Sequence, residues 1–212
     1  MVIARKAQLK PVEVDIKDLC EDTLAILRRT LGARYDIKTS FAPSLHRVMI
    51  DPVQLQSALM NLALNARDAM DNGGELLISV SNVQIDDTYI AQETDITEGD
   101  YVRISVSDNG IGMDHDAQQR AFEPFFTTKS DHGGTGLGLA KVDGFVRQSG
   151  CHITLYSELG LVSSYRLYFP AVLNPTHTSQ RILEKKADRT ARTGRGETVL
   201  VVEDNSKVRK LS

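Results

Sequence analysis

The sequence lacks several features that would assign it to a particular class of protein. No apolar run approaches the ~20 residues that a membrane-spanning helix needs. The chain also does not open with the basic, apolar and small-residue pattern of a secretory signal. The net charge is only -3, so a general electrostatic case for nucleic-acid binding is absent. We therefore expect no nucleic-acid partner and no membrane contact by this segment.

Cysteine is also scarce, because Cys20 and Cys151 stand alone without the spacing of a metal site or a redox motif. Two unpatterned cysteines are typical of a reducing compartment. We therefore expect buried thiols and a cytoplasmic location, which a membrane anchor elsewhere in a longer parent protein would not contradict. The remaining composition, with 41% hydrophobic and 25% charged residues, is ordinary for a globular domain.

Hydrophobic periodicity predicts alternating helices and strands over most of the chain. The expected helices are 16–31, 51–70, 114–121 and 138–148, and the expected strands are 35–41, 48–50, 76–85, 101–106, 151–157 and 164–169. Residues 122–136 are expected to form a long glycine-bearing loop. Loops of this length are usually functional or mobile.

The helix expected after Asp51 carries an unusual polar stripe. Asp51 is suited to cap the first amides, Pro52 to occupy the first turn and Gln54 to complete a capping box. At ~100° per residue, three polar residues farther along fall within a stripe of roughly 60°. A solvated face would explain such a stripe, but asparagine is a poor residue inside a helix. The residues of the stripe are Asn61, Asn65 and Asp68.

Two glycine turns follow this helix in the sequence. The first, Asp108-Asn109-Gly110-Ile111-Gly112-Met113, comes after a predicted strand. A plain Asp-Asn-Gly turn would explain its start but not its second glycine. The second, Gly133-Gly134-Thr135-Gly136-Leu137-Gly138-Leu139, opens a predicted helix and is a candidate phosphate cradle. It is neither a Walker loop nor a dinucleotide fingerprint. Together the three motifs predict a pocket for a purine nucleotide and its metal.

The order of these motifs resembles the ATP-binding domain of sensor histidine kinases, within the gyrase–chaperone–kinase ATPase superfamily. The resemblance covers roughly residues 10–170 and includes an F-box-like segment, Phe122–Lys129. It implies an α+β fold, the Bergerat fold: a two-layer sandwich in which a mixed, mostly antiparallel sheet of about five strands packs on three helices. It also implies ATP and Mg2+ as cofactors.

The resemblance assigns roles to particular residues. Asn65 is expected to hold the metal through its amide oxygen, and Asp108 to accept a hydrogen bond from the exocyclic amine of adenine. Asn61 stands where hydrolysing relatives have a glutamate that activates water, and histidine kinases often have asparagine there too. Asn61 therefore favours transfer to an acceptor over rapid hydrolysis, and Asn61 and Asn65 are the expected catalytic residues. The F box would anchor a mobile loop, and Lys129 would either reach the phosphates or remain solvated. The expected ATP-binding residues are Asn61, Asn65, Asp68, Asp108, Gly110, Gly112, Met113, Lys129, Gly134, Thr135, Gly136, Leu137, Gly138 and Ser163.

One segment departs from the family pattern. The family commonly has Gly-x-Gly-Thr before its last strand, whereas this chain has Gly160-Leu161-Val162-Ser163. Ser163 keeps a hydroxyl that could meet adenine or a bound water. Val162 replaces the second glycine, which leaves the packing of the base open.

The chain is expected to divide into four parts. Residues 1–15 resemble the exit from dimerisation and phosphoacceptor helices, and residues 16–172 the catalytic domain. Residues 173–196 are expected to be a basic linker, and 197–212 the start of a response-regulator receiver domain. None of the five histidines lies in a phosphoacceptor-like helix. We therefore expect a fragment of a hybrid histidine kinase.

Three functions remain open at this point. The first is transfer of the ATP γ-phosphate to a histidine on a dimerisation domain outside this chain. Its partners would be that domain and a receiver domain or response regulator, in a homodimeric parent. The second is a nucleotide-gated ATPase of the gyrase and chaperone type, and the third a module that binds nucleotide without chemistry. Asn61 and the receiver-like tail favour the first.

Overall fold

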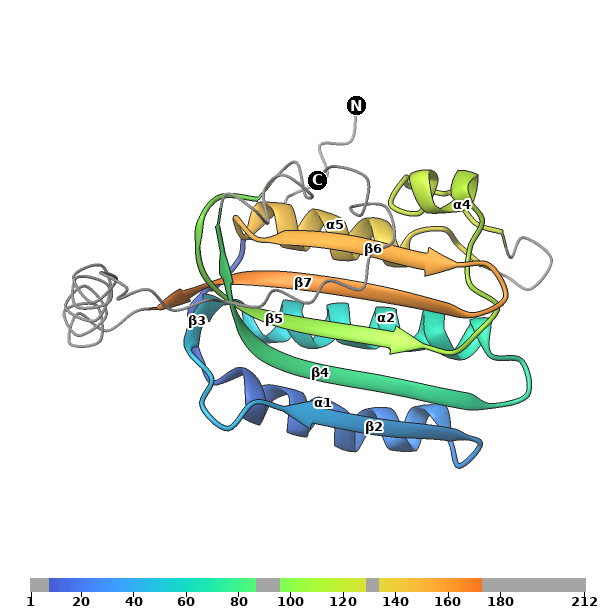
Figure 1. The fold of residues 1–212 in the computed structure, drawn as a ribbon, viewed down its shortest axis with the longest axis horizontal. Coiled ribbons are helices and arrows are strands. Elements are labelled where there is room, and N and C mark those ends of the chain that lie inside the picture. Colours follow the sequence, from blue (N-terminus) through green and yellow to red (C-terminus); the bar gives the residue numbers. More distant parts are fainter. Residues whose placement is uncertain (1–7, 87–95, 129–133, 173–212) are drawn as a thin grey trace, which may run out of the picture. The chain divides into compact units, whose positions relative to one another are not determined.

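The computed structural model describes residues 8–86, 96–128 and 134–172. In chain order the elements are β1 (Val12–Val14), α1 (Ile16–Leu31), β2 (Tyr35–Phe41), β3 (Arg47–Ile50), α2 (Pro52–Ala69), β4 (Gly74–Ile85), β5 (Gly99–Asp108), α4 (His115–Arg120), α5 (Gly138–Gln148), β6 (His152–Glu158) and β7 (Val162–Val172) (Figure 1). The proposed linker and receiver start, and Lys129, lie outside the described residues.

A single mixed sheet forms one layer of the fold. Its strand order is β1-β3-β7-β5-β4-β2, and β6 also pairs with β7. Among the strands in the described residues, only β2 and β4 run parallel, and the other pairs are antiparallel. One edge of β7 pairs with β5. The other edge pairs with β6 over most of its length and with β3 at its last two residues, Ala171 and Val172. The expected α+β fold is therefore confirmed.

The number of strands differs from the expectation. The described residues form a seven-stranded sheet rather than one of about five strands. One addition is β1, whose three residues were expected to lead out of dimerisation helices. So short a segment shows no alternation, and it becomes a strand only because Val12, Glu13 and Val14 pair with the residues of β3.

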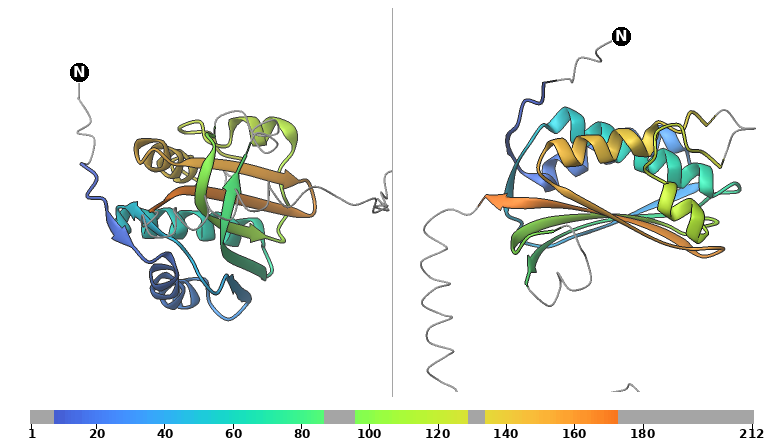
Figure 2. Two further views of the ribbon diagram at one scale, coloured as in Figure 1. Left: turned by 60° about the vertical axis from the view of Figure 1, so that its left-hand side comes forward. Right: turned by 90° about the horizontal axis from the view of Figure 1, so that it is seen from above.

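Three helices, α1, α2 and α5, cover one face of the sheet (Figure 2). Each turns an apolar stripe inward, and in α1 the buried residues recur at helical spacing: Ile16, Cys20, Leu24, Leu27 and Leu31. These residues join those of α2, α5 and the inner face of the sheet in one core. No helix in the described ranges is long and apolar enough to cross a bilayer. Cys20 is buried and Cys151 half-buried, and burial raises the pKa of both thiols to about 12.

Asp51 fixes the start of α2, which carries the predicted polar stripe. Its Oδ1 accepts hydrogen bonds from the backbone N–H groups of Val53 and Gln54, at 3.0 and 3.2 Å. Its Oδ2 accepts from the N–H of Lys10 at 2.9 Å, which ties the segment before β1 to the helix. These bonds, that of Lys10 foremost, hold the pKa of Asp51 below its ordinary value although burial acts in the opposite direction.

We expect Asp51→Ala to lower the free energy of unfolding by about 1–2 kcal/mol, the usual cost of losing a helix cap. Since the folded pKa of Asp51 is depressed, its contribution is present above the unfolded value of about 4 and lost as pH falls through the folded pKa. Urea unfolding at pH 7 and pH 3 measures both effects. Asp15→Ala is the matched control, because Asp15 caps α1 through Lys17 alone. Equal losses from the two variants would contradict the role of the Lys10 bond.

Candidate nucleotide site

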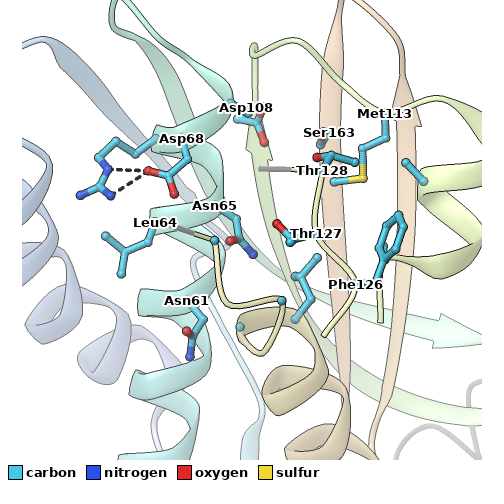
Figure 3. Close-up of a pocket in the computed structure, with 18 of the residues that line it drawn as sticks. Asn61, Leu64, Asn65, Asp68, Asp108, Met113, Phe126, Thr127, Thr128 and Ser163 are labelled. Carbon is cyan, nitrogen blue, oxygen red and sulfur yellow. Dashed lines mark hydrogen bonds and ion pairs between the residues drawn. The ribbon is translucent and has the colours of Figure 1, made fainter. Parts of the chain in front are cut away.

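A cavity of about 320 Å³ opens between α2, the turn after β5 and the loop before α5 (Figure 3). Most of the predicted site residues line it, although they come from distant parts of the sequence. Gly110 and Leu137 lie beside the cavity rather than in its lining. The predicted residues in the lining are Asn61, Asn65, Asp68, Asp108, Gly112, Met113, Gly134, Thr135, Gly136, Gly138 and Ser163.

The polar stripe of α2 forms one wall of the cavity, with its three side chains along one face of the helix (Figure 3). Asn61 Nδ2 donates to the carbonyl of Ser57 at 2.9 Å. Asp68 accepts from Nε and Nη2 of Arg67 at 2.9 and 2.7 Å. Both of these side chains are more than a third exposed, so the pair adds little stability. The stripe therefore borders a cavity and is not a plain solvated face.

The first turn of α5 approaches the two asparagines. A Cβ placed on Gly138 would lie 3.5 Å from Asn61 Oδ1 and 3.8 Å from Asn65 Oδ1. The residue before the helix, Leu137, makes no side-chain hydrogen bond to its first amides. A helix start without a side-chain cap leaves amide donors for another acceptor. The predicted phosphate cradle is thus followed by a helix start without a side-chain cap, and the binding of phosphate there stays a prediction.

Asp108 and Ser163 form the opposite, buried end of the cavity. They pair across β5 and β7, and their side chains are only 4% and 2% exposed. Asp108 Oδ1 accepts from the N–H of Gly110 at 2.9 Å. Burial, followed by the negative charge of Asp108, raises the pKa of the neighbouring Tyr165. This end of the cavity can therefore present a fixed carboxylate to a ligand.

The two glycines after Asp108 permit close packing of the turn. A Cβ on Gly110 would lie 2.6 Å from the carbonyl oxygen of Ala69, so any side chain would push the turn away from α2. Gly112 has a φ of 63°, and a Cβ there would overlap the carbonyl oxygen of Glu158. The N–H of Gly160 also donates to the carbonyl of Ile111 at 2.6 Å. The turn is thus held between α2 and the β6–β7 hairpin.

Two residues that organise the buried end of the cavity were not predicted from the sequence, Ser157 and Gln118. Ser157 Oγ lies 2.8 Å from the N–H of Met113, 2.8 Å from the carbonyl of Val162 and 3.0 Å from Ser163 Oγ. Gln118 Nε2 donates to the carbonyls of Met113 and Ser157. Only the register of the β6–β7 hairpin, which sets Ser157 opposite Ser163, could have pointed to Ser157, and Gln118 lies on the separate helix α4.

Val162, which departs from the family pattern, is not part of the cavity lining among the described residues. Side chains alternate along a strand, so Val162 faces away from the side that carries Ser163. Its carbonyl accepts the hydrogen bond from Ser157.

The described ends of the loop before α5 are joined at their base. The N–H of Phe125 donates to the carbonyl of Gly136 at 2.9 Å, and Gly136 has a φ of 63°. A Cβ on Gly136 would come within 2.7 Å of the Phe125 backbone. Phe125 itself has a φ of 69° and is 75% exposed. Further lining residues, which were not among the expected ATP-binding residues, are Leu64, Arg67, Ala69, Ile111, Ala117, Ala121, Phe126, Thr127, Thr128, Leu139 and Tyr165.

The sequence of this chain is similar to those of known proteins. A family model described as "Histidine kinase-, DNA gyrase B-, and HSP90-like ATPase" matches residues 50–173. Sensor kinase CckA of Brucella abortus (strain 2308) is 34% identical over 99% of this chain and 22% of its own length. Sensor histidine kinase ZraS of Klebsiella oxytoca is 34% identical over 79% of this chain and 33% of its own length. The chain thus spans a third or less of these relatives.

Solved structures share the fold. Full-length ShkA, crystallised in complex with AMPPNP, has a TM-score of 0.63 at 26% identity over 81% of this chain and 33% of its own. The mycobacterial sensor histidine kinase MprB has a TM-score of 0.59 at 21% identity, over 77% of this chain and 98% of its own. The chain therefore belongs to the family of histidine kinase-, DNA gyrase B- and HSP90-like ATPases, and its relatives are sensor histidine kinases.

Proposed function

We propose that this domain binds ATP with Mg2+ and donates the γ-phosphate to a histidine on a separate dimerisation segment. One observation carries the proposal: a single cavity joins a buried carboxylate, a pair of helix asparagines and an uncapped glycine-rich helix start. ShkA, which shares the fold, was crystallised with the ATP analogue AMPPNP.

The base would occupy the buried end of the cavity. Asp108 can accept a hydrogen bond from the amine of adenine, whereas guanine would turn a carbonyl toward the carboxylate. Met113 and Ser163 line the same end and would flank the base. The glycines that pack the Asp108 turn between α2 and the β6–β7 hairpin would keep the carboxylate in place before a ligand arrives.

The phosphates would lie at the other end, against residues 134–138. The backbone amides of α5 can donate to phosphate oxygens, and the positive end of the helix dipole favours negative charge. In the described ranges no three His, Cys, Asp or Glu residues are grouped as a metal site. A metal here would therefore depend on phosphate oxygens and on the neutral oxygen of Asn65, a donor set that suits Mg2+. The ion would neutralise charge on the transferred phosphoryl group.

The proposed acceptor needs positioning more than activation. Histidine has a reference pKa near 6.5, so its ring is largely deprotonated at neutral pH and can attack without a base. The amide of Asn61 cannot take a proton from water at this pH. Phosphoryl transfer depends mostly on positioning and charge neutralisation, which the proposed site and its metal would supply. Of the described histidines, His46, His115 and His152, none lines the cavity, so the acceptor would come from another segment.

We further propose that the parent is a cytoplasmic, homodimeric hybrid kinase whose receiver domain begins at residue 197. The match to CckA extends over 99% of the chain, which supports residues 173–212 as a continuation of the same kind of protein. The gyrase-type alternative receives less support, because the relatives compared are sensor kinases. The free thiols of Cys20 and Cys151 accord with a reducing compartment.

We expect Asn61→Glu to raise ATP hydrolysis without improving transfer to histidine, because the new carboxylate can activate water. Release of inorganic phosphate, measured beside acid-labile phosphohistidine on an added histidine-bearing dimerisation segment, tests this. Asn61→Gln is the matched control, since it lengthens the side chain without adding a base. Rapid hydrolysis by the wild type with no labelled histidine would favour the nucleotide-gated alternative.

A further inference from the structure

The hydroxyl of Ser157 connects the three segments around the buried end of the cavity. Ser157 lies on β6 and is only 6% exposed. Its oxygen is within hydrogen-bond distance of the N–H of Met113, the carbonyl of Val162 and the hydroxyl of Ser163. These groups belong to the turn after β5 and to the start of β7, so one side chain fixes both.

The direction of each bond follows from counting protons. A serine hydroxyl has one proton to donate and two lone pairs to accept with. The N–H of Met113 can only donate, and the carbonyl of Val162 can only accept. Ser157 therefore gives its single proton to Val162, at 2.8 Å. In the contact with Ser163, at 3.0 Å, Ser157 must accept and Ser163 must donate.

This assignment decides what Ser163 can offer to a ligand. Its only proton is committed to Ser157, so only its lone pairs remain for the cavity that it lines. Asp108, opposite Ser163 across the strand pair, is also an acceptor. Two acceptors then face the same buried region, and a ligand group there is favoured when it donates protons.

We propose that Ser157 is a specificity-determining positioning residue, which makes Ser163 an acceptor and thereby selects purines with an amine at C6. Ser157 does not line the cavity itself and acts only through Ser163. The inference rests on the proposed function, because it concerns the base of the nucleotide. Adenine supplies the amine, whereas hypoxanthine places a carbonyl oxygen at the same position.

Calorimetric titration with ADP and with IDP, both with Mg2+, tests the proposal. The measured quantity is the ratio of the two affinities for the wild type, Ser157→Ala and Ser157→Thr. In Ser157→Ala the Ser163 proton is released and can turn toward the carbonyl of hypoxanthine, so we expect the preference for ADP to fall about tenfold. Ser157→Thr keeps a hydroxyl and should restore it. A purely structural defect would weaken both ligands alike.

Ser163→Ala gives a second readout that does not depend on how well the Ser157 variant folds. If Ser163 is an acceptor, its removal lowers the preference for ADP, and if it is a donor, its removal raises the preference. In the double variant Ser157→Ala/Ser163→Ala the ratio should match that of Ser163→Ala alone, because the residues act in series. A raised preference in Ser163→Ala, or an unchanged ratio in Ser157→Ala, would overturn the inference while ADP binding upheld the nucleotide site. Failure of the wild type to bind either nucleotide would overturn the proposed function itself.

Discussion

Asn65→Ala is expected to reduce phosphoryl transfer on the order of 100-fold or more while the base end of the cavity stays intact. Asn65 lines the cavity from α2, and its amide oxygen and amide nitrogen each lie 3.8 Å from a Cβ placed on Gly138, in the first turn of α5. Among the described residues no cluster of carboxylates, thiols or imidazoles offers the metal a substitute site. Without this neutral oxygen, the γ-phosphate would lose both its metal and its alignment.

Two measurements separate this effect from general damage. Transfer is followed as phosphohistidine on an added dimerisation segment, and ATP affinity is measured with and without Mg2+. Asn65→Ala should make the affinity almost independent of Mg2+, whereas Asn65→Asp, which keeps an oxygen ligand, should preserve the dependence. Wild-type transfer by Asn65→Ala would contradict the assignment of this residue to the metal.

The second large effect is expected at the base end, where Asp108→Asn should weaken ATP binding by about 1.5–3 kcal/mol, roughly 10- to 150-fold. The substitution removes the charge from the proposed bond to adenine and leaves a weaker neutral acceptor. It also puts an amide donor close to the N–H of Gly110 or to the base amine. Both changes are costly because residue 108 is buried, with only 4% of its surface exposed.

Calorimetry with ATP and GTP measures this loss. The matched control is Asp114→Asn, because Asp114 caps α4 through the N–H of Ala117 and does not line the cavity. The wild type should bind ATP far more tightly than GTP, and the difference should shrink in Asp108→Asn. Equal wild-type affinities for ATP and GTP would defeat the assignment of Asp108 to adenine.

The features that could be predicted from sequence are those set by local chemistry. The start of α2 follows from an aspartate that caps amides and a proline that suits the first turn, and α2 begins at Pro52, directly after the expected cap Asp51. The helix of residues 16–31 and the strand of residues 35–41 were predicted at their observed bounds, because apolar residues recur at helical spacing in the first and at Tyr35, Ile37 and Phe41 in the second. The glycine turns were visible because few other residues tolerate such close backbone contacts.

The features that sequence could not supply depend on pairing between distant segments. β1 exists only through β3, and the hydrogen bonds of Ser157 exist only through the register of the β6–β7 hairpin. A single serine in a strand forms no sequence pattern that would predict such hydrogen bonds. Val162 illustrates the same limit. Its departure from the family pattern would change the lining of the cavity only if its side chain faced inward. Side chains alternate along a strand, and the side chain of Val162 faces outward.

The length of strand β7 determines where a fluorescent label for measuring nucleotide binding could be attached. Ser163 lies at its start beside the cavity, and Val172, nine residues later, ends both the strand and the described part of the chain. An extended segment of that length spans about 30 Å. A fluorophore attached at Val172 would therefore be too distant to obstruct a nucleotide physically, yet within the range over which energy transfer to a labelled nucleotide is efficient.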